Sequence, residues 1–183
     1  MTKFPICCVS LLSIVTLAGA AGQNTAQAAL RDVKDRSAAP SFRLTDTSGK
    51  SVRLSDFLGK PVALNFWATE CGGCREELPT FVALSGAYKD RGLTVVGVSM
   101  DISYSDLKGA NEGWARVKPF IAAHGMKYQI VLDDGSAEKA FNVTALPSTY
   151  LVDRSGRIAA TYIGAVVDPA NLEANIKTLL AER

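Results

Sequence analysis

The chain alternates between short apolar runs and longer segments in which apolar residues recur at helical spacing. Two runs are almost continuously apolar, residues 61–68 (PVALNFWA) and 93–100 (LTVVGVSM). Their length and their β-branched residues predict two buried strands. A short run at 128–132 predicts another strand, and two runs at 148–152 and 157–163, joined by the turn DRSG, predict a late hairpin.

Helical patterns lie between these strands. Residues 74–89 carry apolar side chains at near-helical spacing, and residues 114–123 predict a second helix. Residues 103–113 are typical of a loop or a loosely helical insertion, and Ser136 is expected to cap a turn through Phe141. Asp168-Pro169 is a helix cap followed by proline at the first helical position, which predicts a last helix to about residue 181.

Residues 41–54 have the pattern of a β-hairpin. Residues 41–44 and 52–54 alternate apolar and polar side chains around the turn sequence TDTSGK. Strands that alternate with helices pair in parallel, and the late hairpin adds antiparallel strands. The sequence therefore predicts an α/β domain with a mixed central sheet flanked by helices.

Residues 1–28 have the pattern of an export signal. Lys3 precedes an apolar run to about residue 18, and two A-x-A sites follow, at 18–20 and 26–28. An uncleaved N-terminal anchor is the alternative, although the run is short for a bilayer span of about 20 residues. Either case places the protein outside the cytoplasm, in the periplasm or its equivalent, and no span is expected after cleavage. Residues 29–40 are polar and small, typical of a linker, and residues 41–183 form one domain.

Composition narrows the function classes. The 183 residues are 48% hydrophobic and 21% charged, as in ordinary globular proteins, and the net charge is +2 without a basic cluster. We therefore expect no nucleic-acid partner. Of the four cysteines, Cys7 and Cys8 lie in the export signal, so the mature chain keeps only Cys71 and Cys74.

Cys71 and Cys74 form a C-x-x-C motif at the turn from a buried strand into a helix. Free N–H groups and the helix dipole favour a thiolate there. Cys71 is expected to attack a partner disulfide, and Cys74 to resolve the mixed disulfide. A structural zinc needs four ligands, whereas the mature chain offers these thiols and His124. A redox-active disulfide, with no metal and no other cofactor, is therefore the prediction; an inert structural disulfide is the alternative.

Three segments in order resemble the thioredoxin superfamily, in particular its exported branch of TlpA, ResA and cytochrome c maturation thioredoxins. They are FWATECGGCREELP, TALPSTYLVD and YIGA, and the resemblance covers about residues 40–183. It implies a thioredoxin-like fold with an N-terminal β-hairpin and a central αβ insertion within residues 93–147.

The resemblance also implies an active-site environment. Pro147 would be cis and would present the Leu146 backbone to an extended partner peptide. Trp67 would cover the disulfide, and Gly164 would lie in a short loop that lines the site. The alternatives are a strand-initiating proline and ordinary aromatic packing.

Some residues depart from the family pattern. Glu70 replaces a tryptophan before the first cysteine, and Gly73, after Gly72, replaces the usual proline. Asn65 stands where cytoplasmic thioredoxins carry a buried aspartate, which leaves the proton shuttle open. Glu77 is the candidate for it, and an ordinary solvated or salt-bridged helix glutamate is the alternative.

We therefore expect an extracytoplasmic thiol-disulfide oxidoreductase that reduces disulfide-bearing protein partners. The resemblance implies electrons from a membrane thiol-disulfide donor and a role in maturation of cytochrome c or another metalloprotein. A peroxiredoxin-type thiol peroxidase is the alternative enzyme, but its P-x-x-x-T-x-x-C turn needs threonine three residues before cysteine, and Thr69 is two before Cys71. A non-catalytic binding module or metallochaperone is the alternative from another class.

Overall fold

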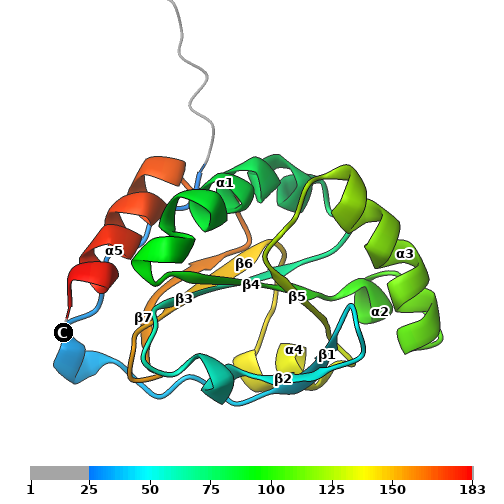
Figure 1. The fold of residues 1–183 in the computed structure, drawn as a ribbon, viewed down its shortest axis with the longest axis horizontal. Helices are drawn as coiled ribbons and strands as arrows, with labels where there is room; N and C mark the ends of the chain where they lie inside the picture. Colours follow the sequence, from blue (N-terminus) through cyan, green and yellow to red (C-terminus); the bar gives the residue numbers. More distant parts are fainter. Residues whose placement is uncertain (1–24, 183) are drawn as a thin grey trace, which may run out of the picture.

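A seven-stranded mixed sheet organises the protein, in the strand order β2-β1-β5-β4-β3-β6-β7 (Figure 1). The computed structural model describes residues 25–182, so most of the predicted export signal lies outside the described residues. The strands are β1 (Arg43–Asp46), β2 (Ser51–Arg53), β3 (Val62–Trp67), β4 (Thr94–Ser99), β5 (Gln129–Leu132), β6 (Ser148–Val152) and β7 (Ile158–Ile163). The helices are α1 (Gly72–Tyr88), α2 (Asp101–Tyr104), α3 (Ala110–Ala123), α4 (Ser136–Phe141) and α5 (Pro169–Ala181), with short 3-10 turns η1 (Val33–Asp35), η2 (Leu54–Phe57) and η3 (Lys89–Arg91).

Strand β3 lies inside the sheet and is buried along its whole length. It pairs in parallel with β4 and antiparallel with β6, while β1 and β2 form the expected antiparallel hairpin. The predicted mixed sheet is therefore confirmed. The segment α3–β5 is inserted between β4 and β6, as the resemblance implies, and β5 extends the parallel pairing.

Helices cover both faces of the sheet. Helices α1, α3 and α5 lie on one face, and the short helix α4 lies on the other (Figure 1). Side chains of β3 alternate between the two layers: Leu64 and Phe66 pack into the core beneath α4, whereas Ala63 and Trp67 pack beneath the longer helices. Because β3 is covered on both sides, it reads as an unbroken apolar run in the sequence.

The region between β4 and β5 is more helical than the sequence pattern predicts. Helix α2 follows β4 directly, and α3 begins at Ala110, four residues before the predicted start. Gly113 explains the difference, since a Cβ atom there would lie 2.8 Å from Leu132 Cδ2. Glycine usually indicates a loop, but here it lets the first turn of α3 pack closely on β5.

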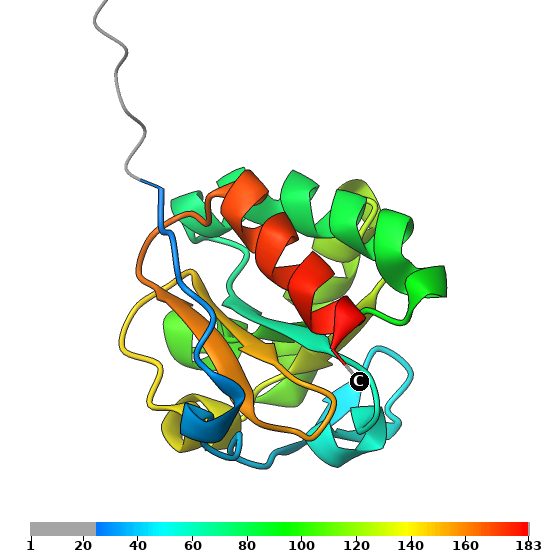
Figure 2. The ribbon, with the colours of Figure 1, turned by 90° about the vertical axis from the view of Figure 1, so that its left-hand side faces the viewer.

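The segment 29–40, predicted to be a linker, is attached to the domain along its length. It runs beside β7 and α5 (Figure 2). Arg36 is buried and its guanidinium contacts Asp153 and Glu182 at 3.2 and 2.6 Å. Backbone hydrogen bonds join Arg31 to Ala159, Ser37 to Ile158, and Ala39 to Gly156. A polar segment can cover a sheet edge through its backbone, and apolar periodicity does not reveal such pairing.

Two helical glycines provide a matched test of this packing. Gly86 lies in α1, and a Cβ atom there would meet no atom within 4 Å. We expect Gly86→Ala to stabilise the protein by up to about 1 kcal/mol, because alanine is the better helix former. Gly113→Ala is expected to destabilise it by about 1–2 kcal/mol through overpacking. Urea denaturation of both variants measures the two signs, and equal stabilisation would contradict the close α3–β5 contact.

Candidate active site

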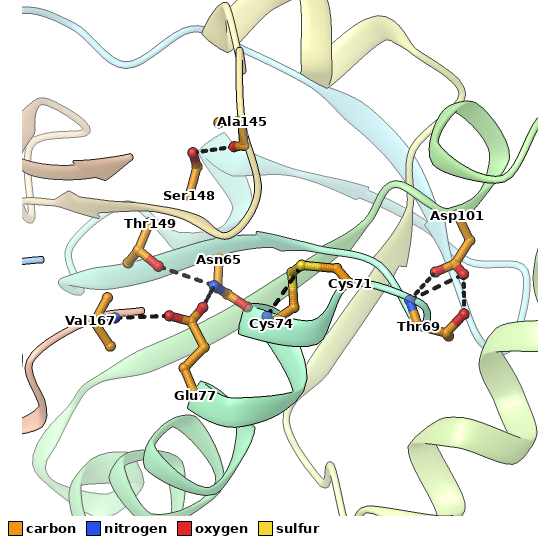
Figure 3. The surroundings of a disulfide bond; sticks show 10 residues. All are labelled: Asn65, Thr69, Cys71, Cys74, Glu77, Asp101, Ala145, Ser148, Thr149 and Val167. Atoms are coloured by element: carbon orange, nitrogen blue, oxygen red, sulfur yellow. Dashed lines mark hydrogen bonds between the residues drawn. A yellow bond between two sulfur atoms is a disulfide. The ribbon is translucent and has the colours of Figure 1, made fainter. Parts of the chain in front are cut away.

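Cys71 and Cys74 are joined by a disulfide at the start of α1 (Figure 3). Strand β3 ends at Trp67 and α1 begins at Gly72, so the pair occupies the strand-to-helix turn that the sequence predicts. Cys71 is the helix cap, and its sulfur accepts a hydrogen bond from the Cys74 amide at 3.2 Å. Cys71 is 4% exposed and Cys74 is fully buried, so Cys71 is the more accessible cysteine.

Two loops meet the start of α1 beside the disulfide. The Leu146–Pro147 peptide bond is cis, and a Cβ atom on Gly73 would lie 3.3 Å from Pro147 Cδ. The usual proline of the family would therefore be crowded at position 73 in this chain. Gly164 donates its N–H to the Pro147 carbonyl at 2.9 Å, and its φ of +72° is one that glycine adopts readily. Gly72, in contrast, is exposed and borders open space.

Trp67 is fully buried in the same apolar cluster as both cysteines. Its ring stacks on Phe120 at a centroid distance of 5.4 Å, and Phe120 stacks in turn on His124 at 3.9 Å. The indole Nε1 lies 2.9 Å from where a Cβ atom of Gly97 would be. Trp67 therefore packs in one apolar cluster with both cysteines and with Val117 of α3, and the lone histidine caps the end of α3.

The side chain of Glu70 is 63% exposed and pairs with a cation. Its carboxylate lies 3.0 Å from the Arg116 guanidinium and accepts a hydrogen bond from the Ser105 hydroxyl at 3.1 Å. Glu70 therefore lies next to Cys71, as expected, but its negative charge is paired with Arg116 of α3.

Glu77 is 1% exposed, which excludes the solvated helix glutamate considered from the sequence. Its two oxygens accept hydrogen bonds from Asn65 Nδ2 at 2.7 Å and from the Val167 amide at 3.1 Å. Asn65 also donates to the Thr149 hydroxyl at 3.1 Å (Figure 3). Among residues 25–182, no lysine or arginine forms an ion pair with Glu77.

Burial raises the pKa of Glu77 to about 7, while the hydrogen bonds from Val167 and Asn65 act in the opposite direction. Glu77 follows Cys74 by three residues on α1, so the two side chains share one face of the helix. A carboxyl group with a near-neutral pKa can both accept and release a proton at physiological pH. Helix α1 therefore carries a buried acid–base group on the same face as the buried cysteine.

Asp101 is a site residue that the sequence pattern did not reveal. It is fully buried, and its carboxylate accepts hydrogen bonds from the Thr69 amide, the Thr69 hydroxyl and the Ser99 hydroxyl. Its position directly after a buried strand is the available signal in the sequence, but an ordinary turn residue occupies the same position. The contact fixes the segment between β3 and Cys71 against the end of β4 (Figure 3).

The described part of the chain holds no cluster of three metal-ligating side chains. Within residues 25–182, no helix combines the length and the apolar character needed to cross a bilayer.

The raised pKa of Glu77 predicts a pH-dependent stability. An unfolded glutamate titrates near pH 4.5 and the folded one near 7, so the folded protein holds an extra proton between these values. Its contribution to stability is complete below about pH 4.5 and is lost, by about 3 kcal/mol in total, as the pH rises through 7. We expect Glu77→Gln to remove this loss in the oxidised protein, whereas the exposed neighbour Glu76→Gln keeps it. Urea denaturation between pH 5 and 8 measures the difference; an unchanged loss in Glu77→Gln would refute it.

Sequence comparison relates the chain to known proteins. The sequence model of the AhpC/TSA family matches residues 36–161. The thiol-disulfide oxidoreductase ResA of Bacillus subtilis is 31% identical over 159 residues, which cover 86% of this chain and 83% of ResA. ResA of Geobacillus kaustophilus is 35% identical over 131 residues, covering 71% of this chain and 70% of that protein.

Solved structures agree with the sequence comparison. The thioredoxin domain of a Bacteroides vulgatus thiol-disulfide oxidoreductase superposes with a TM-score of 0.64 at 31% identity, over 78% of this chain and 96% of that one. A thiol:disulfide interchange protein of the thioredoxin family from Chlorobium tepidum gives 0.67 at 27% identity, over 80% and 97%. Together with the disulfide at the start of α1, these matches establish that the chain belongs to the AhpC/TSA family of thioredoxin-like proteins and is a thiol-disulfide oxidoreductase of the ResA type.

Proposed function

We propose that this oxidoreductase works outside the cytoplasm and reduces disulfides in partner proteins. The observation that carries the proposal is the Cys71–Cys74 disulfide at the start of α1, with the cis-Pro147 loop against Gly73 and the buried Glu77 three residues after Cys74. The extracytoplasmic location is supported by the export pattern of residues 1–28. The direction of electron flow is inferred from the resemblance to the exported branch of the superfamily.

In the first step, the reduced protein acts through Cys71. The Cys71 thiolate attacks one sulfur of the partner disulfide, the partner S–S bond breaks, and the other partner sulfur leaves as a thiolate. Cys71 caps α1, where unpaired N–H groups and the helix dipole favour a negative sulfur. The product is a mixed disulfide between Cys71 and the partner.

In the second step, Cys74 resolves the mixed disulfide. Its thiol loses a proton to the carboxylate of Glu77, and the resulting thiolate attacks the Cys71 sulfur. The Cys71–Cys74 bond forms, and the partner leaves with both of its sulfurs reduced. Because the pKa of Glu77 is about 7, the carboxyl can afterwards return the proton to solvent. Two electrons pass from this protein to the partner.

Partner peptides are proposed to bind beside the cis-proline. Leu146 lies outside the helices and strands, and its backbone makes no hydrogen bond to another backbone group within residues 25–182. Its N–H and C=O can therefore pair with an extended peptide. A hollow of about 200 Å³ lies next to it, lined in part by Met100, Tyr104, Val143 and Glu138. Tyr104 is 49% exposed, as expected for an aromatic contact that a partner side chain covers.

The cycle requires a second partner that restores the dithiol. We propose a membrane thiol-disulfide donor for this step, and cytochrome c or another metalloprotein under assembly as the acceptor. Both assignments rest on the resemblance to the exported branch. Where cysteines bind the metal or attach the haem, these cysteines must be reduced first.

The proposal predicts that partners can be trapped. In Cys74→Ser, Cys71 still attacks, but the mixed disulfide cannot be resolved within the protein. We expect partner adducts to accumulate when this variant is expressed in its native compartment, detected by non-reducing electrophoresis and mass spectrometry. Cys71→Ser, with the other cysteine intact, is the matched control and should trap far fewer partners. Adducts of equal amount in the two variants, or none in Cys74→Ser, would overturn protein disulfide exchange.

A further inference from the structure

The first described residues are joined to the loop that follows β7. Ala26 donates its N–H to the Val166 carbonyl at 2.7 Å, and its own carbonyl accepts the Asp168 N–H at 2.9 Å. These bonds make a parallel bridge between Ala26 and Val167. The Gln27 side chain adds a hydrogen bond to the Asp168 carboxylate at 3.0 Å. Figure 2 shows this N-terminal segment passing beside β7 and α5.

The bridge determines where the backbone of Val167 points. Along an extended chain, successive N–H and C=O groups face opposite sides. Since the Val166 carbonyl and the Asp168 amide both face Ala26, the Val167 amide faces the other way, and there it donates to Glu77 Oε2 at 3.1 Å. Residues 166–168 therefore connect Ala26, on one side of the loop, with the buried carboxyl group of Glu77 on the other.

The same loop also touches the beginning of α1. A Cβ atom on Gly73 would lie 3.4 Å from Val166 Cγ2, so Val166 packs next to the turn that holds the cysteines. Further along, the Ala28 amide donates to Asn171 Oδ1 at 3.0 Å, and Asn175 Nδ2 donates to the Ala28 carbonyl at 2.8 Å. The segment is thus held on one side by α5 and supports the active-site loop on the other.

We propose that residues 25–28 form an N-terminal strap that positions the Val167 amide on Glu77, and that export processing leaves this strap on the mature protein. The proposal builds on the proposed role of Glu77 in proton transfer. Of the two small-residue sites in the leader, cleavage after Ala28 would remove Ala26 and Gln27, whereas cleavage after Ala20 keeps them. Because the strap contains Ala26 and Gln27, the export signal must be cleaved at the site at residues 18–20 for the strap to remain.

Loss of the strap has a defined chemical consequence. The Val167 hydrogen bond stabilises the charged form of Glu77 and so holds its pKa below the value that burial alone would impose. Without the parallel bridge, the loop is no longer held in the conformation that aims this donor. The titration of Glu77 then moves to higher pH, and the carboxylate that accepts the Cys74 proton becomes scarcer at neutral pH.

The titration can be measured without any thiol reaction. In the full-length protein, Ala26→Pro removes the N–H that binds Val166 and also restricts the local backbone, whereas Ala26→Gly keeps the N–H. Ala29→Pro is the matched control, because Ala29 is exposed and its amide makes no hydrogen bond to another described residue. Nuclear magnetic resonance follows the chemical shift of the Glu77 carboxyl carbon against pH in the oxidised form. Its signal is assigned by being absent from the spectrum of Glu77→Gln.

We expect the Glu77 midpoint to rise by about one pH unit in Ala26→Pro and to stay at the wild-type value in Ala26→Gly and Ala29→Pro. A simple loss of stability would lower the unfolding temperature and leave this midpoint in place. An unchanged midpoint in folded Ala26→Pro would overturn the positioning role. Failure of this test leaves partner trapping by Cys74→Ser intact, so the two proposals are judged separately.

The processing site is measured on the wild-type protein. The intact mass of the protein exported by its native host gives its first residue directly. We expect Ala21, and any start upstream of Thr25 keeps the strap. A mature chain that begins at Ala29 would overturn the proposal even if no position 26 variant folds.

Discussion

A buried carboxyl group must have hydrogen-bond donors around it, and in this protein that requirement connects the sheet, the redox helix and the N-terminal segment. Glu77 projects from α1 onto Asn65 of β3, which in turn donates to Thr149 of β6. Its second oxygen is bound by the Val167 amide, whose loop is fastened to Ala26. A shift of β3 or of the Val167 loop relative to α1 would remove one of the two donors of this carboxyl, which is costly in the interior.

A second buried carboxylate fixes the other end of the motif. Asp101 binds both the amide and the hydroxyl of Thr69, two residues before Cys71. The C-x-x-C turn therefore lies between two anchored points, Thr69 before it, which Asp101 binds, and Glu77 one turn into the helix. This arrangement explains how a short segment with two glycines, Gly72 and Gly73, can be held in one conformation. Rigid placement of the sulfurs beside the cis-proline is what disulfide exchange requires.

The sequence predicted the features that depend on local patterns. The apolar run of β3, the C-x-x-C at its end and the Asp168-Pro169 start of α5 lie where the pattern indicates, since buried strands and helix caps have local causes. The resemblance supplied the cis-proline and the loop of Gly164.

Other features depend on contacts between distant segments, and no local sequence pattern indicates them. Asp101 resembles an ordinary turn residue until Thr69 is placed beside it. Gly113 suggests a loop until Leu132 is packed against it, and then only a residue without a side chain fits. Ala26, Ala28 and Leu30 pack against the core at alternate positions, but two alanines and one leucine are too weak a pattern to predict a strand, and residues 31–40 are held by backbone hydrogen bonds and by the buried Arg36. Glu77 differs from an exposed helix glutamate only through its burial.

In the proposed function, Cys71 and Cys74 form a reversible two-electron couple that delivers electrons to partners. The most direct measurement is the equilibrium reduction potential of the pair in defined dithiol–disulfide buffers. We expect a single two-electron transition whose potential lies closer to that of thioredoxin, about −270 mV, than to that of a dedicated protein oxidant, about −120 mV. A potential near the oxidant value, or a disulfide that does not equilibrate with the buffer, would contradict it.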